Sequence, residues 1–334
     1  MIETKKDIVD KFGRVHDYLR ISLTERCNLR CFYCMPEEGI RLRDKANFMT
    51  SEELIAIAET FVSLGIKKIR LTGGEPLIKK DAKNLLLQLG KLPVELAITT
   101  NAVLVDQFID TFKTAGIKSV NVSLDSLNED SFNNISRRNY FKRIKANIDL
   151  LIEHDFHVKV NVVVIKNVNE HEIPAFIEWT KEKPIHIRFI EFMPFDGNKW
   201  NWDKKVSFKE MMNIANSHFG ENGIKKIQDK KNDTARSFKL NTGKGTFGII
   251  SSVTNPFCDT CNRIRLTADG KIKNCLFSES ETDLLTAYRK KRDIEALIRE
   301  SIMDKKKERG GAKAFDDEDF IKNMKNRSMT TIGG

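Results

Sequence analysis

The six cysteines of this chain form two groups of three. The first group has the spacing C-x3-C-x2-C and consists of Cys27, Cys31 and Cys34. The second group has the spacing C-x2-C-x13-C and consists of Cys258, Cys261 and Cys275. Clustered cysteines in an intracellular chain favour metal or redox chemistry over disulfide bonds. We therefore expect all six to be metal ligands.

Three thiolates in each group suit an iron–sulfur cube better than a zinc ion. A structural zinc site needs four ligands, and His16, the nearest histidine to the first group, lies eleven residues before Cys27. A [4Fe–4S] cluster is normally held by four cysteines, so three would leave one iron open to another ligand. Two [4Fe–4S] clusters are thus the expected cofactors, and one four-cysteine zinc site with two spare cysteines is the alternative.

Six predicted strands alternate with helices between residues 18 and 200. The apolar pattern predicts strands over residues 18–23, 67–71, 94–99, 118–124, 157–165 and 186–191. It predicts helices over residues 51–64, 81–89, 105–115, 141–154 and 170–181. This order is typical of a parallel sheet covered by helices. The expected fold is α/β, an incomplete (β/α)6 TIM-like barrel, with its site at the carboxyl ends of the strands.

Motifs rich in polar residues lie at or just after the carboxyl ends of five of these predicted strands. They are Thr24, Gly73-Gly74-Glu75, Thr99-Thr100-Asn101, Ser123-Leu124-Asp125 and Glu191-Phe192-Met193. Because the carboxyl ends of parallel strands meet at one edge, these residues are expected on a single rim. The alternatives are an ordinary turn at Gly73-Gly74, a simple strand end at Ser123 and a core position for Met193.

Residues 1–200 and 201–334 are expected to form two regions, because the composition changes after about residue 200. Strands are predicted over residues 246–250 and 264–267, and Asp269-Gly270 is typical of a hairpin turn. The second cysteine group then lies on loops and a hairpin of this carboxyl-terminal extension. Residues 289–309 carry a net charge of +4 and are predicted to form one solvated helix.

Arg263 and Arg265 lie two positions apart on a predicted strand between Cys261 and Cys275. Side chains at this spacing face the same way, so both guanidinium groups are expected beside the second cysteine group. Guanidinium groups suit phosphate or carboxylate ligands. The alternative is a pair of surface arginines in salt bridges.

The composition limits the class of protein. The 57 Lys and Arg against 47 Asp and Glu give a net charge of +10, which suits an anionic substrate, a nucleotide, a nucleic acid or a lysine-rich solvated surface. The 40% of hydrophobic residues rules out wholesale disorder. No run approaches the roughly 18 apolar residues of a membrane span, and residues 1–10 carry no apolar signal region. A cytoplasmic protein without a membrane partner is expected.

Residues 24–36, TERCNLRCFYCMP, resemble the C-x3-C-x-aromatic-C motif of the radical S-adenosylmethionine (SAM) superfamily. The resemblance implies that the open iron of the first cluster binds SAM, and that electron transfer from the cluster releases a 5′-deoxyadenosyl radical. It also implies SAM contacts at Tyr33, Gly74, Ser123 and Met193.

Within this superfamily the chain resembles the GTP 3′,8-cyclase family of molybdenum cofactor biosynthesis over nearly its whole length. The shared motifs are Arg20 before the first cysteine group, GGEP, residues 121–125, 159–163, 188–193 and 258–265, and the terminal Gly333-Gly334. The resemblance implies that the radical takes hydrogen from C3′ of GTP, that the ribose attacks C8 of guanine, and that the second cluster binds the guanine.

The family likeness also implies roles for particular residues of this chain. The implied GTP contacts are Arg20, Arg70, Thr99, Lys159, Arg263 and Arg265. The implied catalytic residues are Arg263, Arg265, Gly333 and Gly334, with the tail reaching the active site; a frayed terminus is the alternative. The implied partners are a low-potential electron donor and cyclic pyranopterin monophosphate synthase, which takes the product. A homodimer is compatible with the resemblance, and no nucleic acid is expected.

The chain departs from the family pattern at a few positions. Ala102 follows Asn101 where the family usually has glycine, Lys79-Lys80 stands where arginine is usual, and Thr330 follows Met329 where asparagine is common. Two other functions are the alternatives to a GTP 3′,8-cyclase. A radical SAM peptide maturase would usually carry more carboxyl-terminal cysteines, and a zinc-dependent nucleic-acid-binding protein leaves the GGEP rim unexplained.

Overall fold

A single mostly parallel sheet forms the centre of the molecule. The computed structural model describes residues 7–35, 39, 43–198, 200–312, 315 and 326–333. The first six strands are β1 (Tyr18–Ser22), β2 (Lys68–Thr72), β3 (Glu95–Thr100), β4 (Ser119–Ser123), β5 (His157–Val164) and β6 (His186–Glu191). Each pairs in parallel with the next. The expected α/β fold with a parallel sheet is confirmed.

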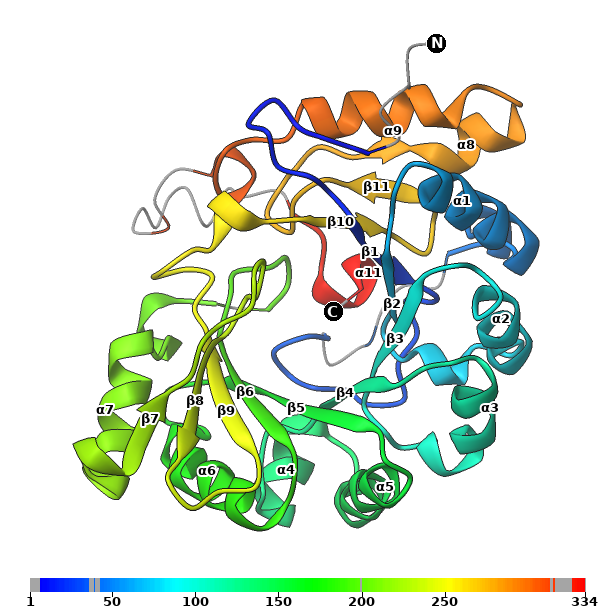
Figure 1. Cartoon of the computed structure of the whole chain (residues 1–334). Coiled ribbons are helices and arrows are strands. Elements are labelled where there is room, and N and C mark those ends of the chain that lie inside the picture. The colour runs from blue at the N-terminus through cyan, green and yellow to red at the C-terminus, as the bar shows by residue number, and fades with distance from the viewer. Residues whose placement is uncertain are drawn as a thin grey trace.

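Helices follow these strands and cover the outer face of the sheet (Figure 1). They are α1 (Ser51–Ser63), α2 (Ala82–Leu89), α3 (Ile109–Thr114), α4 (Glu129–Ser136), α5 (Phe141–Glu153) and α6 (Ile173–Glu182). α1 begins with a capping box, in which Thr50 accepts from the Glu53 N–H and the Glu53 side chain accepts from the Thr50 N–H. The core between helices and sheet contains fully buried aromatic side chains such as Phe61, Phe112 and Phe176.

Strands from the second half of the chain extend the same sheet at both ends. β9 (Thr246–Ile250) pairs in parallel with β6, and β10 (Arg263–Leu266) pairs in parallel with β1. The outer strands are antiparallel and consist of β8 (Arg236–Leu240) and β7 (Ile224–Lys226) on one side, and of β11 (Lys271–Lys273) and β12 (Thr282–Asp283) on the other. The described strands thus form one open, curved sheet with edges at β7 and β12 (Figure 1).

The carboxyl-terminal segment returns to the middle of this sheet. α7 (Phe208–Phe219) lies on the outside, whereas α11 (Met329–Ile332) lies in the opening enclosed by the curved sheet (Figure 1). The predicted hairpin at Asp269-Gly270 is confirmed, since it joins β10 to β11 and Gly270 has a φ of +70°. No helix of the described residues is long and apolar enough to cross a membrane.

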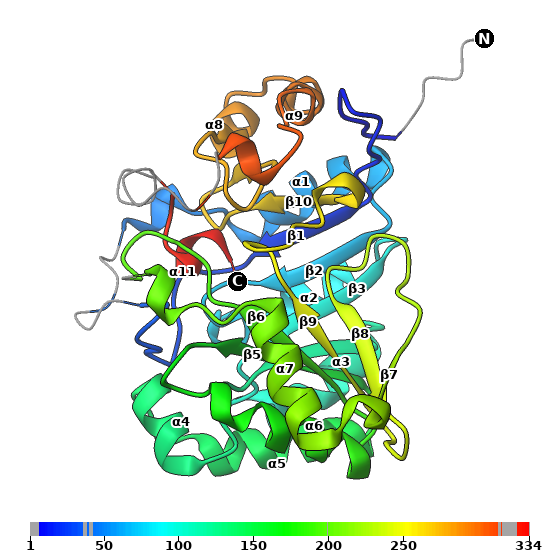
Figure 2. The ribbon, with the colours of Figure 1, turned by 90° about the vertical axis from the view of Figure 1, so that its left-hand side faces the viewer.

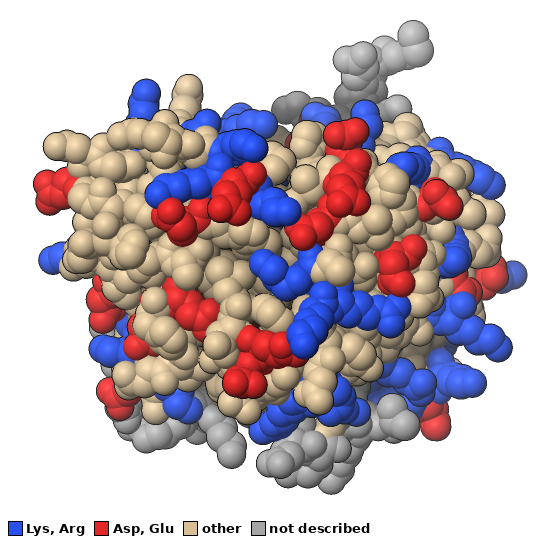
Figure 3. All heavy atoms as spheres, turned by 90° about the horizontal axis from the view of Figure 1, so that it is seen from below, with Lys and Arg blue, Asp and Glu red and all other residues tan. Residues whose placement is uncertain are grey.

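The prediction of one solvated helix over residues 289–309 is wrong. The chain forms α8 (Leu284–Arg289) and α9 (Ile294–Met303), which lie together at one end of the molecule (Figure 2). Lys291 has a left-handed φ of +53°, and Asp293 starts the second helix by accepting a hydrogen bond from the Ala296 N–H. α9 is only partly solvated, because Ile298 is buried. On the face shown in Figure 3, basic and acidic side chains are interspersed, which is the pattern of a solvated surface.

Candidate active site

The first cysteine group lies on the loop that follows β1 and lines what we call the first cavity. This cavity is also lined by the residues predicted to contact SAM, which are Tyr33, Gly74, Ser123 and Met193. Thr99, predicted to contact GTP, lies on the same wall at the end of β3. The rim predicted from the sequence is therefore brought together at the carboxyl ends of the strands.

The GGEP stretch supports the loop that carries the cysteines. The Gly74 N–H donates to the Thr24 carbonyl oxygen at 2.7 Å, and the Glu75 N–H donates to the Arg26 carbonyl oxygen at 2.7 Å. A Cβ on Gly74 would lie 2.3 Å from the Arg26 oxygen, so only glycine fits against this backbone. The glycine of this motif thus fixes the loop just before Cys27, in addition to lining the cavity.

Two buried carboxyl groups hold the ends of neighbouring strands around the first cavity. Glu75 accepts hydrogen bonds from the Thr100 hydroxyl and the Asn101 N–H, each at 2.7 Å, and burial raises its pKa to about 7. Asp125 accepts a hydrogen bond of 2.6 Å from the Tyr33 hydroxyl. This bond ties the Tyr33 ring to the end of β4.

The second cysteine group lines a second cavity, whose walls are strongly basic. The cationic residues on its walls are Arg20, Lys68, Arg70, Lys159, Arg188, Arg263, Arg265, Lys273 and Arg309. Five of the six predicted GTP contacts lie here, and Thr99 is the one that lies in the first cavity instead. Sequence reasoning missed Arg188 and Lys68. Each of them lies on the same face of its strand as another residue that lines the second cavity, so the strand period could have indicated them.

Like charges oppose one another across three neighbouring strands of this cavity. Arg20 on β1 is in register with Arg265 on β10 and with Arg70 on β2. Like charges placed directly opposite in a sheet are destabilising. Burial and the neighbouring cations lower the pKa of Arg188 to about 9 and that of Lys159 to about 8. A bound anion such as a polyphosphate would offset the repulsion among these buried cations.

Two cysteines of the second group differ in their surroundings, because burial raises the pKa of Cys258 whereas the cations beside Cys261 favour its thiolate. The Lys305 ammonium donates to Cys261 Sγ at 3.6 Å, and the Arg309 N–H donates to Cys258 Sγ at 3.4 Å. Burial alone would raise the pKa of Cys261, but Lys305 and Arg263 outweigh it and lower the pKa to about 6. The thiolate is the form that binds iron.

The first cysteine group lies in a drier environment. Burial raises the pKa of Cys27 to about 11 and that of Cys34 to about 12, and a bound metal deprotonates such thiols outright. In the described part of the chain, no three Cys, His, Asp or Glu side chains are arranged around a single ion. A [4Fe–4S] cluster places each thiolate on a different iron, and two partly exposed cysteine triplets, each on its own cavity wall, fit that group.

The carboxyl-terminal segment lies where the two cavities meet. Met193 and Met329 line both cavities, which therefore adjoin. Arg265 Nη1 donates to the Gly333 carbonyl oxygen at 2.7 Å. Gly333 has a φ of +88°, and a Cβ there would lie 2.8 Å from Ser22 Cβ. Gly334, also predicted to be catalytic, lies outside the described residues.

Two models of known protein families match this chain, one in each half. The chain matches the family model described as "Radical SAM superfamily" over residues 21–180 and the one described as "Molybdenum Cofactor Synthesis C" over residues 185–310. The structure of SuiB from Streptococcus suis bound to S-adenosylmethionine superposes with a TM-score of 0.65, covering 86% of this chain and 67% of that chain. Its sequence identity is 16%, so this likeness concerns the fold.

Curated relatives match over almost the whole chain. The mitochondrial GTP 3′,8-cyclase of Arabidopsis thaliana is 45% identical, over 98% of this chain and 83% of that protein. The GTP 3′,8-cyclase of Listeria welshimeri is 39% identical, over 97% of this chain and 98% of that protein. Molybdenum cofactor biosynthesis protein 1 of Homo sapiens is 43% identical over 97% of this chain. The chain spans about half the length of the animal relatives, 56% for Drosophila melanogaster and 51% for Homo sapiens.

Proposed function

The chain belongs to the GTP 3′,8-cyclase family of radical SAM enzymes, and we propose that it converts GTP to (8S)-3′,8-cyclo-7,8-dihydroguanosine 5′-triphosphate, the first step of molybdenum cofactor biosynthesis. One observation carries the proposal. Two cavities, each with a cysteine triplet on its wall, adjoin at Met193 and Met329, and the second is lined by opposed arginines. This arrangement suits an anionic nucleotide that reaches from one cavity into the other.

The first cavity would hold the SAM cofactor and one [4Fe–4S] cluster on Cys27, Cys31 and Cys34. When bound, this pair supplies the 5′-deoxyadenosyl radical that takes the hydrogen from C3′ of GTP. The chain positions SAM and excludes water from the reacting groups. Tyr33, Gly74, Ser123 and Met193 contact SAM, and the apolar side chains of Met193 and Met329 exclude water from the place where the radical meets the ribose.

The second cavity would hold GTP between its cations and a second [4Fe–4S] cluster on Cys258, Cys261 and Cys275. Arg20, Arg70, Lys159 and Arg188 bind the triphosphate, whose several negative charges offset the repulsion among these groups. The guanine then lies toward the second cysteine triplet. Thr99 lies on the wall of the first cavity and would face the ribose.

Arg263, Arg265 and the terminal glycines would act at the junction of the two cavities. Arg265 holds the Gly333 carbonyl oxygen and lies beside the second cysteine triplet, so it links the tail to the bound nucleotide. Without a side chain, Gly333 lets the backbone approach Ser22 and Thr72 closely. We propose that Arg263, Arg265, Gly333 and Gly334 assist the cyclisation.

The proposal extends to the wider pathway. A low-potential electron donor would supply the electrons, and cyclic pyranopterin monophosphate synthase would take the product. A homodimer and a cytoplasmic location stay predictions, as does the expectation that no nucleic acid binds. The Arabidopsis thaliana relative is described as mitochondrial.

The test is to count iron and sulfide after anaerobic purification and reconstitution. Two clusters predict about eight irons and eight sulfides per chain, and about four remain in either Cys34→Ser or Cys275→Ser. Four irons in the unaltered chain would remove the substrate cluster from the proposal. Zinc in place of iron would refute the radical chemistry.

A further inference from the structure

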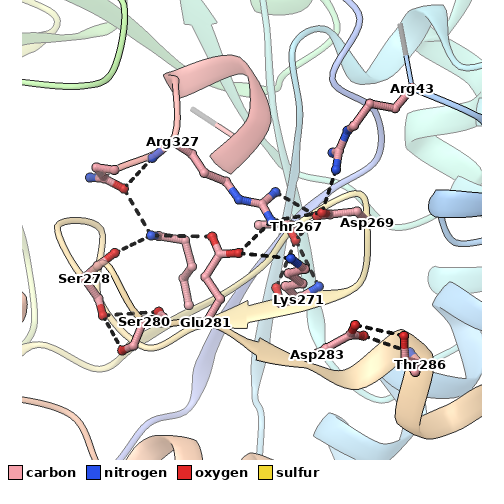
Figure 4. Close-up of polar contacts among 12 residues, drawn as sticks. Arg43, Thr267, Asp269, Lys271, Ser278, Ser280, Glu281, Asp283, Thr286 and Arg327 are labelled. Carbon is pink, nitrogen blue, oxygen red and sulfur yellow. Dashed lines mark hydrogen bonds and ion pairs between the residues drawn. The ribbon is translucent and has the colours of Figure 1, made fainter. Parts of the chain in front are cut away.

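Asp269 lies between two arginines that come from distant parts of the chain (Figure 4). It sits on the turn between β10 and β11, and its side chain is 4% exposed. Arg327 holds it with two parallel hydrogen bonds, Nη1 to Oδ1 at 2.8 Å and Nη2 to Oδ2 at 2.9 Å. Arg43 Nη1 donates to Oδ2 at 3.0 Å from the other side.

The segment that carries Arg327 has further anchors in the same network. Arg327 Nη2 also donates to Glu281 Oε2 at 2.6 Å. Its neighbour Asn326 accepts a hydrogen bond of 3.1 Å from the buried Lys273 ammonium, which lies 3.7 Å from Glu281 Oε1. These contacts fix the chain six residues before Gly333, just before α11 begins at Met329.

The network also reaches the loop of the first cysteine group. Arg43 pairs with Glu25 as well as with Asp269. Glu25 is two residues before Cys27 and is buried. Asp269 therefore pairs with Arg327 of the carboxyl-terminal segment and with Arg43, which also pairs with Glu25 on the loop of the first cysteine group.

The hydrogen-bonded pair of Asp269 and Arg327 is expected to be a strong contact. Exposed ion pairs contribute little, but bidentate arginine–carboxylate pairs with little solvent are among the strongest hydrogen-bonded contacts. Burial opposes ionisation of Asp269, yet the hydrogen bonds from Arg327, Thr267 and Arg43 outweigh it and hold the pKa of this carboxyl well below its usual range. The pair is thus fully charged at neutral pH.

We infer that Asp269 and Arg327 form a latch that docks the carboxyl-terminal segment and keeps Gly333 against Arg265 where the two cavities meet. Asp269 is a positioning residue, because it acts through Arg327 and touches neither predicted substrate nor cofactor site. The catalytic consequence of the latch rests on the proposed function; the docking itself does not.

Asp269→Asn is the test variant, and Asp283→Asn is its matched control. Asp283 lies in the same region but bonds Thr286 at the start of α8, away from the tail (Figure 4). Hydrogen exchange of the carboxyl-terminal peptide of the full chain reports docking through the amides of Thr331, Ile332 and Gly333, which are bonded within α11. We expect these amides to exchange at least about tenfold faster in Asp269→Asn and at the unaltered rate in Asp283→Asn.

Activity gives a second, separate readout in the reconstituted enzyme. The kcat of Asp269→Asn is expected to fall by a factor of about ten or more, while the dissociation constant of GTP stays within about threefold, because the phosphate cavity is left intact. Arg327→Gln repeats the test from the tail side and leaves the Arg43 pair with Asp269 in place.

The outcomes separate the latch from the proposed function. Exchange at the unaltered rate in both Asp269→Asn and Arg327→Gln would overturn the latch. Faster exchange with full kcat would keep the docking contact but remove its catalytic consequence. If the unaltered chain neither bound nor converted GTP, the proposed function would fail, and faster exchange in the variants would still support the docking.

Discussion

Arg265 on β10 donates a hydrogen bond of 2.7 Å to the carbonyl oxygen of Gly333, which lies 68 positions further along the chain. The same arginine lines the cavity of the second cysteine group and is in register with Arg20 on β1. The end of the chain is thus bonded to the strand that carries predicted substrate contacts. The carboxyl-terminal segment therefore lies against the walls of both cavities, which Met329 also lines.

Gly333→Ala is expected to lower kcat by a factor of about ten or more, because the added Cβ displaces backbone that must be held in position. The Cβ would lie 2.8 Å from Ser22 Cβ and 3.0 Å from Thr72 Cγ2, at a φ of +88°. Gly116→Ala is the control, since Gly116 has a φ of +71° but nothing lies within 4 Å of its Cβ position. Both variants lose about 1 kcal/mol of stability from the left-handed backbone. Equal turnover in the two variants would contradict the account.

Arg188→Met is expected to weaken GTP binding by a factor of about 10 to 100, because the proposed contact between this buried guanidinium and phosphate is lost. Calorimetry with GTP and with guanosine separates phosphate from base recognition, and guanosine binding should change little. Arg143→Gln removes a solvent-exposed arginine from α5 and serves as the control. An equal loss for guanosine would place Arg188 against the base instead.

Much of the fold and of the site was predictable from local patterns. The six strands follow from apolar runs, and the cysteine triplets follow from spacing. The period of two on β10 predicted that Arg263 and Arg265 would face the same way, beside the second cysteine group, and both line the cavity of that group. The resemblance also supplied Arg20 and Lys159, which lie in the same cavity.

The residues that were missed depend on long-range contacts. Arg188 sits within a recognised motif, but only the pairing of β5 with β6 brings it beside the other cations. Lys273 reaches the cavity from β11 of the hairpin, and Arg309 reaches it from the short 3-10 helix Arg309–Gly311. Asp269 was predicted only as a turn residue, because no local pattern indicates that Arg327 lies against it.

Ala102→Gly is expected to raise the free energy of unfolding by about 1 kcal/mol, because alanine pays a steric cost in the left-handed region that glycine avoids. Ala102 is fully buried with a φ of +62°, held by hydrogen bonds to Thr100 and Asn147. Denaturant unfolding of both proteins measures the difference. A less stable variant would mean that the methyl group's packing outweighs the backbone strain.

His16 is expected to make the protein less stable as the pH falls below neutrality. Burial and the nearby Lys305 lower its pKa to about 4 from the ordinary value of 6.5, despite its hydrogen bond with Asp10. Between these values the unfolded chain binds a proton that the folded chain does not, so stability decreases with falling pH by up to about 1.4 kcal/mol per pH unit.

The measurement is anaerobic unfolding at pH 7.5 and pH 5.5. The unaltered chain should lose about 1 kcal/mol more than His16→Gln over this range. His157→Gln, at an exposed position, should behave as the unaltered chain does. An identical pH dependence in all three proteins would show that His16 gains its proton in the folded state as readily as in the unfolded state.

The most direct test of the proposed reaction uses GTP carrying deuterium at C3′. The reconstituted enzyme is incubated anaerobically with this substrate, SAM and a strong reductant, and the 5′-deoxyadenosine is analysed by mass spectrometry. The account predicts one deuterium in 5′-deoxyadenosine and a cyclised nucleotide that has lost it. Unlabelled 5′-deoxyadenosine, formed at the same rate with or without GTP, would contradict hydrogen abstraction from C3′ and with it the central claim.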